Sequence, residues 1–211
     1  MVLALLGLAL VIANIHNTSK QQAHLQNVKS AIPYATTPKT TTSSTSSSSD
    51  EELILNPIID LSGWQLPQDI DYDVLSNHIS GAIVRVFGGS LISKDSNAAS
   101  SNGVDKSFKT HIKELKKRDV PVAVYSYAQG ASVKEMKEEA RIFYKNASPY
   151  KPTYYWIDVE EETMPNMEEG VQAFLAELKR LGADKVGLYI GAYFMLEQEV
   201  STRNFDAVWI P

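Results

Sequence analysis

Between residues 57 and 210, short apolar runs alternate with segments in which apolar side chains recur at helical spacing. The apolar runs are nearly continuous, whereas a strand with one wet face would alternate apolar and polar residues. Continuous runs are typical of parallel strands that are covered on both faces. We therefore predict strands at 57–61, 81–87, 121–127, 154–161, 185–190 and 206–210.

Three helices are predicted between these strands, at 104–118, 132–146 and 171–181. The first ends in basic residues, which suit the carboxyl end of a helix. The second begins with Ser132 and Glu135 at the spacing of a capping box, and Gly182 is placed to stop the third. This alternation predicts an α/β fold of repeated βα units around a parallel sheet.

The first 55 residues lack this pattern. Val2–Ala13 is an uncharged apolar run of 12 residues, which is shorter than the ~20 residues of a membrane-spanning helix. No basic segment precedes it and no clear cleavage site follows. We predict that residues 1–16 are a signal peptide or a membrane anchor, and whether it is cleaved stays open. Residues 17–55 are polar and rich in Ser and Thr, which predicts a disordered tether before a globular domain at 56–211.

The composition argues against several classes of function. The net charge of −5 and the lack of a basic stripe argue against a nucleic-acid partner. The chain has no cysteine, which excludes disulfides, thiolate zinc sites and a cysteine nucleophile. Its histidines show no ligand spacing, so we predict neither a metal nor another cofactor. An apolar segment followed by a tether predicts an extracellular or cell-surface protein, secreted or anchored, and the apolar segment could contact a membrane.

One long connection, residues 88–103, is rich in Ser, Asn and Gly and has no periodicity. It follows the second predicted strand. Long loops at the carboxyl ends of strands in such folds often shape sites. An insertion without a role explains the composition equally well, and both readings stay open.

Two acids end the fourth predicted strand. Because side chains in a strand alternate between faces, Asp158 and Glu160 point the same way, while Ile157 and Val159 point into apolar packing. Neighbouring carboxyl groups that are partly desolvated repel each other, which raises one pKa. One protonated and one ionised carboxyl are what glycosidic bond cleavage requires. The plainer alternative is a pair of solvated acids at the start of a loop, which Glu161 and Glu162 would continue.

Other polar and aromatic residues are predicted to join this pair. Asp60 ends the first strand and Tyr127 the third, and in a βα barrel all these strand ends meet on the face that holds the active site. Aromatic side chains near strand ends would stack on sugar rings, although each taken alone is more often a core residue. The aromatic candidates for substrate binding are Tyr127, Tyr189, Trp209 and Trp64.

Four collinear motifs resemble those of family 25 glycoside hydrolases, the Chalaropsis-type lysozymes or N-acetylmuramidases. The matching segments run in order from about Pro57 to Pro211 and are Ile59–Gln65, Tyr125–Ala128, Trp156–Glu160 and Gly187–Ile190. The resemblance implies an irregular TIM-like barrel of five βα units followed by three strands. About six strands are found here, so we expect an incomplete barrel, truncated at its carboxyl end. We expect a 1–211 product to be poorly soluble and weakly active or inactive.

The resemblance also implies an activity. It is hydrolysis of the β-1,4 bond between N-acetylmuramic acid and N-acetylglucosamine, with peptidoglycan glycan strands as the partner and a monomeric protein. Glu160 stands where the family has its catalytic acid, and would protonate the leaving oxygen. Asp158 would stay ionised and stabilise the developing positive charge or a substrate N-acetyl group, and Asp60 would tune the pair.

Two other functions compete with this one. A family 18 chitinase would need further acids where Thr153 and Trp156 stand, so only part of that motif is present. The alternative from another class is a non-catalytic, surface-tethered glycan-binding module on a degenerate barrel. A binding module has no need of acids that repel each other, so the intact Asp158 and Glu160 favour the enzyme.

Overall fold

A computed structural model describes residues 56–88 and 98–211. The predicted signal or anchor (1–16), the predicted tether (17–55) and most of the 88–103 connection lie outside the described residues. The domain bounds therefore stay predictions. Within the described part, no helix is long and apolar enough to cross a membrane.

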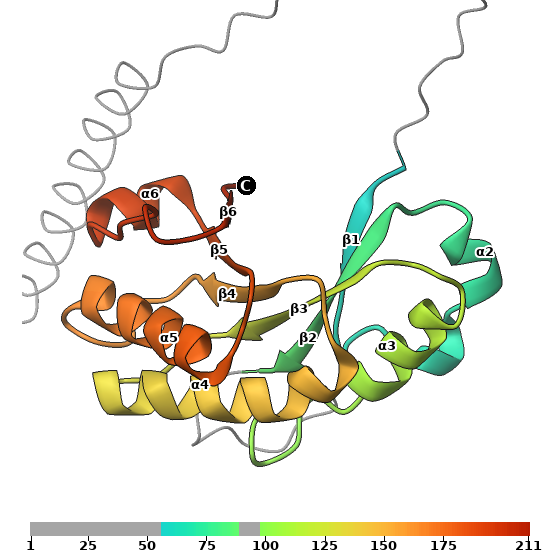
Figure 1. Ribbon diagram of the computed structural model, residues 1–211, viewed down its shortest axis with the longest axis horizontal. Coiled ribbons are helices and arrows are strands. Elements are labelled where there is room, and N and C mark those ends of the chain that lie inside the picture. The colour runs from blue at the N-terminus through green and yellow to red at the C-terminus, as the bar shows by residue number, and fades with distance from the viewer. Residues whose placement is uncertain (1–55, 89–97) are drawn as a thin grey trace, which may run out of the picture. The chain divides into compact units, whose positions relative to one another are not determined.

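Six parallel strands form one sheet whose spatial order follows the sequence order. The sheet curls into part of a barrel (Figure 1). This confirms the predicted incomplete α/β barrel, and each predicted strand lies within two residues of its observed bounds. The strands are β1 (Ile58–Leu61), β2 (Gly81–Phe87), β3 (Val122–Tyr127), β4 (Tyr155–Val159), β5 (Val186–Ile190) and β6 (Ala207–Trp209).

All three predicted helices are present, with shorter or shifted bounds, as α3 (Phe108–Lys116), α4 (Val133–Ala147) and α5 (Met167–Leu181). Two short helices were not predicted, α2 (Tyr72–Ser76) and α6 (Ala192–Glu197), and neither were the 3-10 turns η1 (Pro67–Asp69) and η2 (Ser148–Tyr150). With α2 and α6 included, each of the first five strands is followed by a helix. The expected five βα units are therefore confirmed.

The helix ends follow the sequence signals, with one difference. The Ser132 hydroxyl accepts the Glu135 N–H at the start of α4, as a capping box requires. The Glu135 carboxylate, however, accepts the Ala131 N–H (2.9 Å) and not that of Ser132. At the end of α5, Gly182 has a φ of 104°, a left-handed conformation that glycine adopts without strain.

The core lies between the sheet and the helices that run beside it (Figure 1). One face of the sheet contributes fully buried β-branched and aliphatic side chains such as Val84, Val124 and Ile157. They pack with Phe143 of α4 and Phe174 of α5, whose rings lie 6.5 Å apart. Because alternate residues of each strand are used in this packing, the remaining ones face the inside of the curled sheet.

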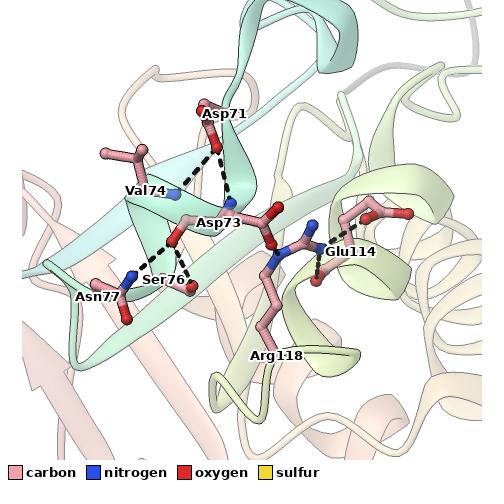
Figure 2. Close-up of polar contacts among 7 residues, drawn as sticks. All are labelled: Asp71, Asp73, Val74, Ser76, Asn77, Glu114 and Arg118. Carbon is pink, nitrogen blue, oxygen red and sulfur yellow. Dashed lines mark hydrogen bonds and ion pairs between the residues drawn. The ribbon is translucent and has the colours of Figure 1, made fainter.

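An ion-pair network holds α2 against α3 (Figure 2). The Asp71 carboxylate caps α2 by accepting the Asp73 and Val74 N–H groups (3.0 Å each). Arg118, just after α3, donates to the carboxylates of Asp73 and Glu114 (2.6 Å each). Exposed ion pairs stabilise a fold little, so the network mainly fixes where α2 lies.

A buried histidine connects these helices to the segment after β1. His111 of α3 is fully buried, and burial lowers its pKa, so the ring is neutral. Its Nε2–H donates to the Ser62 carbonyl oxygen (3.1 Å), and its Nδ1 accepts the Tyr72 hydroxyl (2.6 Å). The polypeptide that leaves β1 is thus fixed at Ser62.

On the inner face, Gly187 of β5 makes room for the indole of Trp156 of β4. The two residues are partners in the sheet register. A Cβ added to Gly187 would lie 2.5 Å from the Trp156 ring. The glycine is therefore required by the indole beside it.

Replacing Gly187 by alanine should destabilise the protein by about 1–3 kcal/mol, because the indole must move or the strands must separate. Chemical denaturation, with tryptophan fluorescence as a second readout, measures the effect. Gly191→Ala is the matched control, since a Cβ there meets nothing within 4 Å and its φ is −64°. Equal losses in the two variants would contradict this explanation.

Candidate active site

An open cavity of about 180 Å³ lies on the inner face of the sheet, where residues of all six strands meet. Glu160, the residue just after β4, also lines this cavity. The lining residues are Asp60, Ile83, Tyr125, Trp156, Asp158, Glu160, Tyr189 and Trp209. Three of these eight are acidic and four are aromatic, so the cavity combines carboxyl groups with flat apolar surfaces.

The cavity brings together most of the predicted site residues. The three predicted catalytic acids, Asp60, Asp158 and Glu160, all line it, and so do Tyr189 and Trp209. Their convergence follows from the parallel sheet, because the carboxyl ends of all strands lie on one side. Their chemical roles remain predictions.

Two predicted substrate-binding residues do not line the cavity. Tyr127 is the register partner of Asp158, but its hydroxyl donates to the Glu161 carboxylate (2.7 Å). Trp64, in the segment after β1, is 63% exposed. Both therefore lie outside the group that surrounds the acids.

The carboxyl group of Asp158 is buried at the wall of the cavity. Its residue is 8% exposed, and its Oδ1 is buried without a hydrogen-bond partner among the described residues. Burial raises the pKa of this carboxyl to about 8. The charge of Glu160, a hydrogen bond shared with Glu160 and the charge of Asp60 act in the same direction, while Arg85 opposes them. The pair therefore holds a proton at neutral pH.

Our expectation placed the proton on Glu160 and left Asp158 ionised, whereas the raised pKa is that of Asp158 in the free protein. The physical reason is depth in the cavity. Asp158 lies within β4 and is desolvated, whereas Glu160 lies beyond the strand end and is exposed. Desolvation disfavours the charged form of a carboxyl, so the buried member keeps the proton in the free protein.

Sequence reasoning missed a buried ion pair near this site. Asp105 is fully buried and accepts hydrogen bonds from Arg85 (3.0 Å), the Gly63 N–H (2.7 Å) and the Ser107 N–H (2.8 Å). It thereby joins the segment after β1 to β2 and to the start of α3. The positive charge of Arg85 opposes protonation of Asp158. The lone arginine inside the apolar run 81–87 was the available signal.

Aromatic rings form a connected surface in the same cavity. Tyr189 and Trp209 meet edge to face with 5.1 Å between ring centroids, and Trp156 meets Trp209 at 6.4 Å in the same manner. Tyr125 completes the lining, and burial strongly raises the pKa of its hydroxyl, which stays protonated. Aromatic surfaces beside polar groups suit the apolar faces of sugar rings.

Comparison with known proteins places this geometry in a family. The sequence profile described as "Glycosyl hydrolases family 25" matches residues 59–211. A glycosyl hydrolase 25 of Streptococcus pneumoniae, described as a virulence factor participating in host cell invasion, is 56% identical. The similarity covers 75% of this chain and 69% of that chain, with a TM-score of 0.72. A search of curated proteins finds no match.

More distant solved structures share the fold. The catalytic domain of the endolysin ply40, from a Listeria monocytogenes bacteriophage, is 23% identical over 68% of each chain, with a TM-score of 0.57. The modular autolysin LytC of Streptococcus pneumoniae is 22% identical over 66% of this chain and 33% of its own, with a TM-score of 0.53.

Asp158 should make stability depend on pH. The folded protein keeps this proton up to about pH 8, whereas an unfolded aspartate releases it near pH 4. The folded state thus binds more protons in this window, so the unfolding free energy should fall as pH rises, by up to about 1.4 kcal/mol per pH unit. In Asp158→Asn this contribution should be lost.

Denaturation at a series of pH values measures both slopes. Asp69→Asn, at an exposed acid of η1, is the matched control and should keep the wild-type slope. If Asp158→Asn also kept it, the carboxyl would not hold a proton in the folded protein.

Proposed function

The chain belongs to family 25 of the glycosyl hydrolases, and we propose that it is a lysozyme that hydrolyses bacterial peptidoglycan. The bond cut is the β-1,4 bond between N-acetylmuramic acid and N-acetylglucosamine. One observation carries the proposal, namely the desolvated Asp158 beside the exposed Glu160 in a cavity lined with aromatic rings. The endolysin and the autolysin named above provide the class of substrate by analogy.

The two carboxyls would share the work of bond cleavage. Glu160 is the exposed member, so it is the one that a glycosidic oxygen in the cavity can reach. Because Glu160 lies near enough to raise the pKa of Asp158, the proton of Asp158 would pass through Glu160 to the leaving oxygen. When the proton leaves the pair, both carboxyls are ionised, and Asp158 stabilises positive charge on the sugar or its N-acetyl group. Water completes the hydrolysis and returns a proton to the pair.

Supporting residues would adjust this exchange. Asp60 adds negative charge that favours the protonated pair, and Arg85 limits that effect. The aromatic surface of Tyr189 and Trp209 would hold a sugar ring beside the acids, whereas Tyr127 and Trp64 would contact only more distant sugars. A non-catalytic glycan-binding module would need the aromatic surface but not the protonated pair.

The place of action would be outside the cytoplasmic membrane, where peptidoglycan lies. The apolar run Val2–Ala13 and the Ser/Thr-rich segment that follows support this location from sequence. We propose that this segment directs or anchors the domain there and that the domain acts as a monomer.

Glu160→Gln should abolish hydrolysis, because the amide has no proton to give to the leaving oxygen. We expect the rate of reducing-end release from purified cell walls to fall at least about a hundredfold. Reducing-end labelling detects rates that turbidity would miss. Borohydride reduction of the new ends should give muramitol, which identifies the bond.

Glu162→Gln is the matched control, since Glu162 is exposed two residues further on and does not line the cavity. It should keep the wild-type rate. Wild-type rates in Glu160→Gln would refute Glu160 as the acid. Glucosaminitol in place of muramitol would refute the proposed bond.

Trp209→Ala should weaken substrate binding, because a stacking surface beside the acids is lost. We expect KM to rise several-fold, which corresponds to about 1 kcal/mol, with a smaller effect on kcat. Trp64→Ala, which removes an exposed indole outside the cavity, should raise KM less. Equal changes in the two variants would mean that the cavity is not where the sugar stacks.

A further inference from the structure

We propose that Glu139, a buried glutamate of α4 outside the cavity, is a positioning residue for the Asp158–Glu160 pair. Glu139 would fix the turn at residues 129–131, and this turn would hold the segment that carries Glu160. The inference rests on the proposed function in one respect, because the pair is taken to be catalytic. The linkage itself follows from hydrogen bonds in the structure.

Glu139 binds the inner side of this turn. Its residue is fully buried, and its Oε2 accepts the N–H of Gln129 (3.0 Å). Glu135, one helical turn earlier, accepts the N–H of Ala131 (2.9 Å). Two backbone donors of the turn, at its first and last residues, are therefore held by two carboxyl groups of one helix.

The turn is pressed closely against α4. A Cβ added to Gly130 would lie 2.6 Å from the Met136 backbone nitrogen. Glycine is thus needed for this approach, and the turn has little room to shift toward the helix. Without the Glu139 acceptor, the turn would be free to move away from α4.

The outer side of the same turn holds the segment after β4. The Gln129 side chain donates to the Glu161 carboxylate (3.2 Å), and the Thr163 hydroxyl donates to the Gly130 carbonyl oxygen (2.8 Å). The Ala128 N–H donates to the Asp158 carbonyl oxygen (2.9 Å). These bonds reach residues on both sides of Glu160 in the sequence, so the turn and the Glu160 segment are expected to move together.

Stability does not explain why a glutamate stands at this position. Its Oε1 is buried without a partner among the described residues, which costs free energy. Burial raises its pKa to about 7, and the charge of Glu135 adds to this effect although backbone N–H groups of the turn oppose it. An apolar side chain would pack in α4 at lower cost. Only a side chain with an acceptor oxygen can form the hydrogen bond to the N–H of Gln129 in the turn.

The test compares Glu139→Met, which removes the acceptor but keeps the bulk, with Glu139→Gln, which keeps an acceptor oxygen. Glu177→Met is the matched control, because Glu177 is also a buried glutamate but pairs with Arg141 of α4 and with Arg180 of its own helix α5, and not with the turn. Two readouts are taken where each variant is folded. They are kcat and KM for cell-wall hydrolysis, and the titration midpoint of the Asp158 carboxyl by ¹³C NMR.

For Glu139→Met we expect kcat to fall about tenfold or more with KM within about twofold, since small displacements of a catalytic group are costly. The Asp158 midpoint should shift as well. Glu139→Gln should recover most of kcat, and Glu177→Met should change neither readout although it lowers stability. If Glu139→Met does not fold, Thr163→Val decides, and it should lower kcat several-fold by removing the bond to Gly130.

Wild-type kcat and an unchanged Asp158 midpoint in Glu139→Met, or in Thr163→Val in its place, would overturn the inference and leave the lysozyme proposal intact. If the wild-type chain of 211 residues did not hydrolyse cell walls, kcat would be lost as a readout. The midpoint measured in the folded variants would then still decide whether Glu139 positions the pair.

Discussion

Burial of the Asp158 carboxyl beside Glu160 is the interaction on which the rest of the site depends. A carboxyl that is 8% exposed, with one oxygen lacking a partner, is unfavourable when ionised. The charges of Glu160 and Asp60 make ionisation of Asp158 less favourable still. The protein therefore keeps a proton where a soluble acid would have lost it, and such a proton is available for transfer at neutral pH.

The surrounding fold maintains this unfavourable arrangement. Parallel strands bring Asp60, Asp158 and Glu160 to one side of the sheet, and the apolar contacts of the opposite face hold the strands in register. Two buried carboxyls outside the cavity secure the segments around it. Asp105 fixes the polypeptide after β1 through Gly63, and Glu139 fixes the turn after β3 through Gln129. The site is thus supported by polar contacts placed inside the protein and not at its surface.

The sequence predicted those features that depend on local pattern. Continuous apolar runs located the six strands, and the period of two placed Asp158 and Glu160 on one face. The short helices α2 and α6 escaped prediction because they contain five and six residues, too few to show a helical period. The sequence also did not show which polar side chains are buried. Burial raises the pKa of Asp158. The hydrogen bond from the Tyr127 hydroxyl to Glu161 also had no signal in the sequence. Arg85 and Glu139 gain their partners only from the folded arrangement.

The most direct test of the protonated pair is a pH titration of the wild-type protein by ¹³C NMR of its aspartate side chains. The Asp158 carboxyl should titrate with a midpoint near 8. Its resonance should also respond when Glu160 is replaced by glutamine, since the charge of Glu160 raises the pKa of Asp158. A midpoint near 4, the ordinary value for an aspartate, would show that both acids are ionised at neutral pH. Asp158 would then hold no proton for Glu160 to pass on.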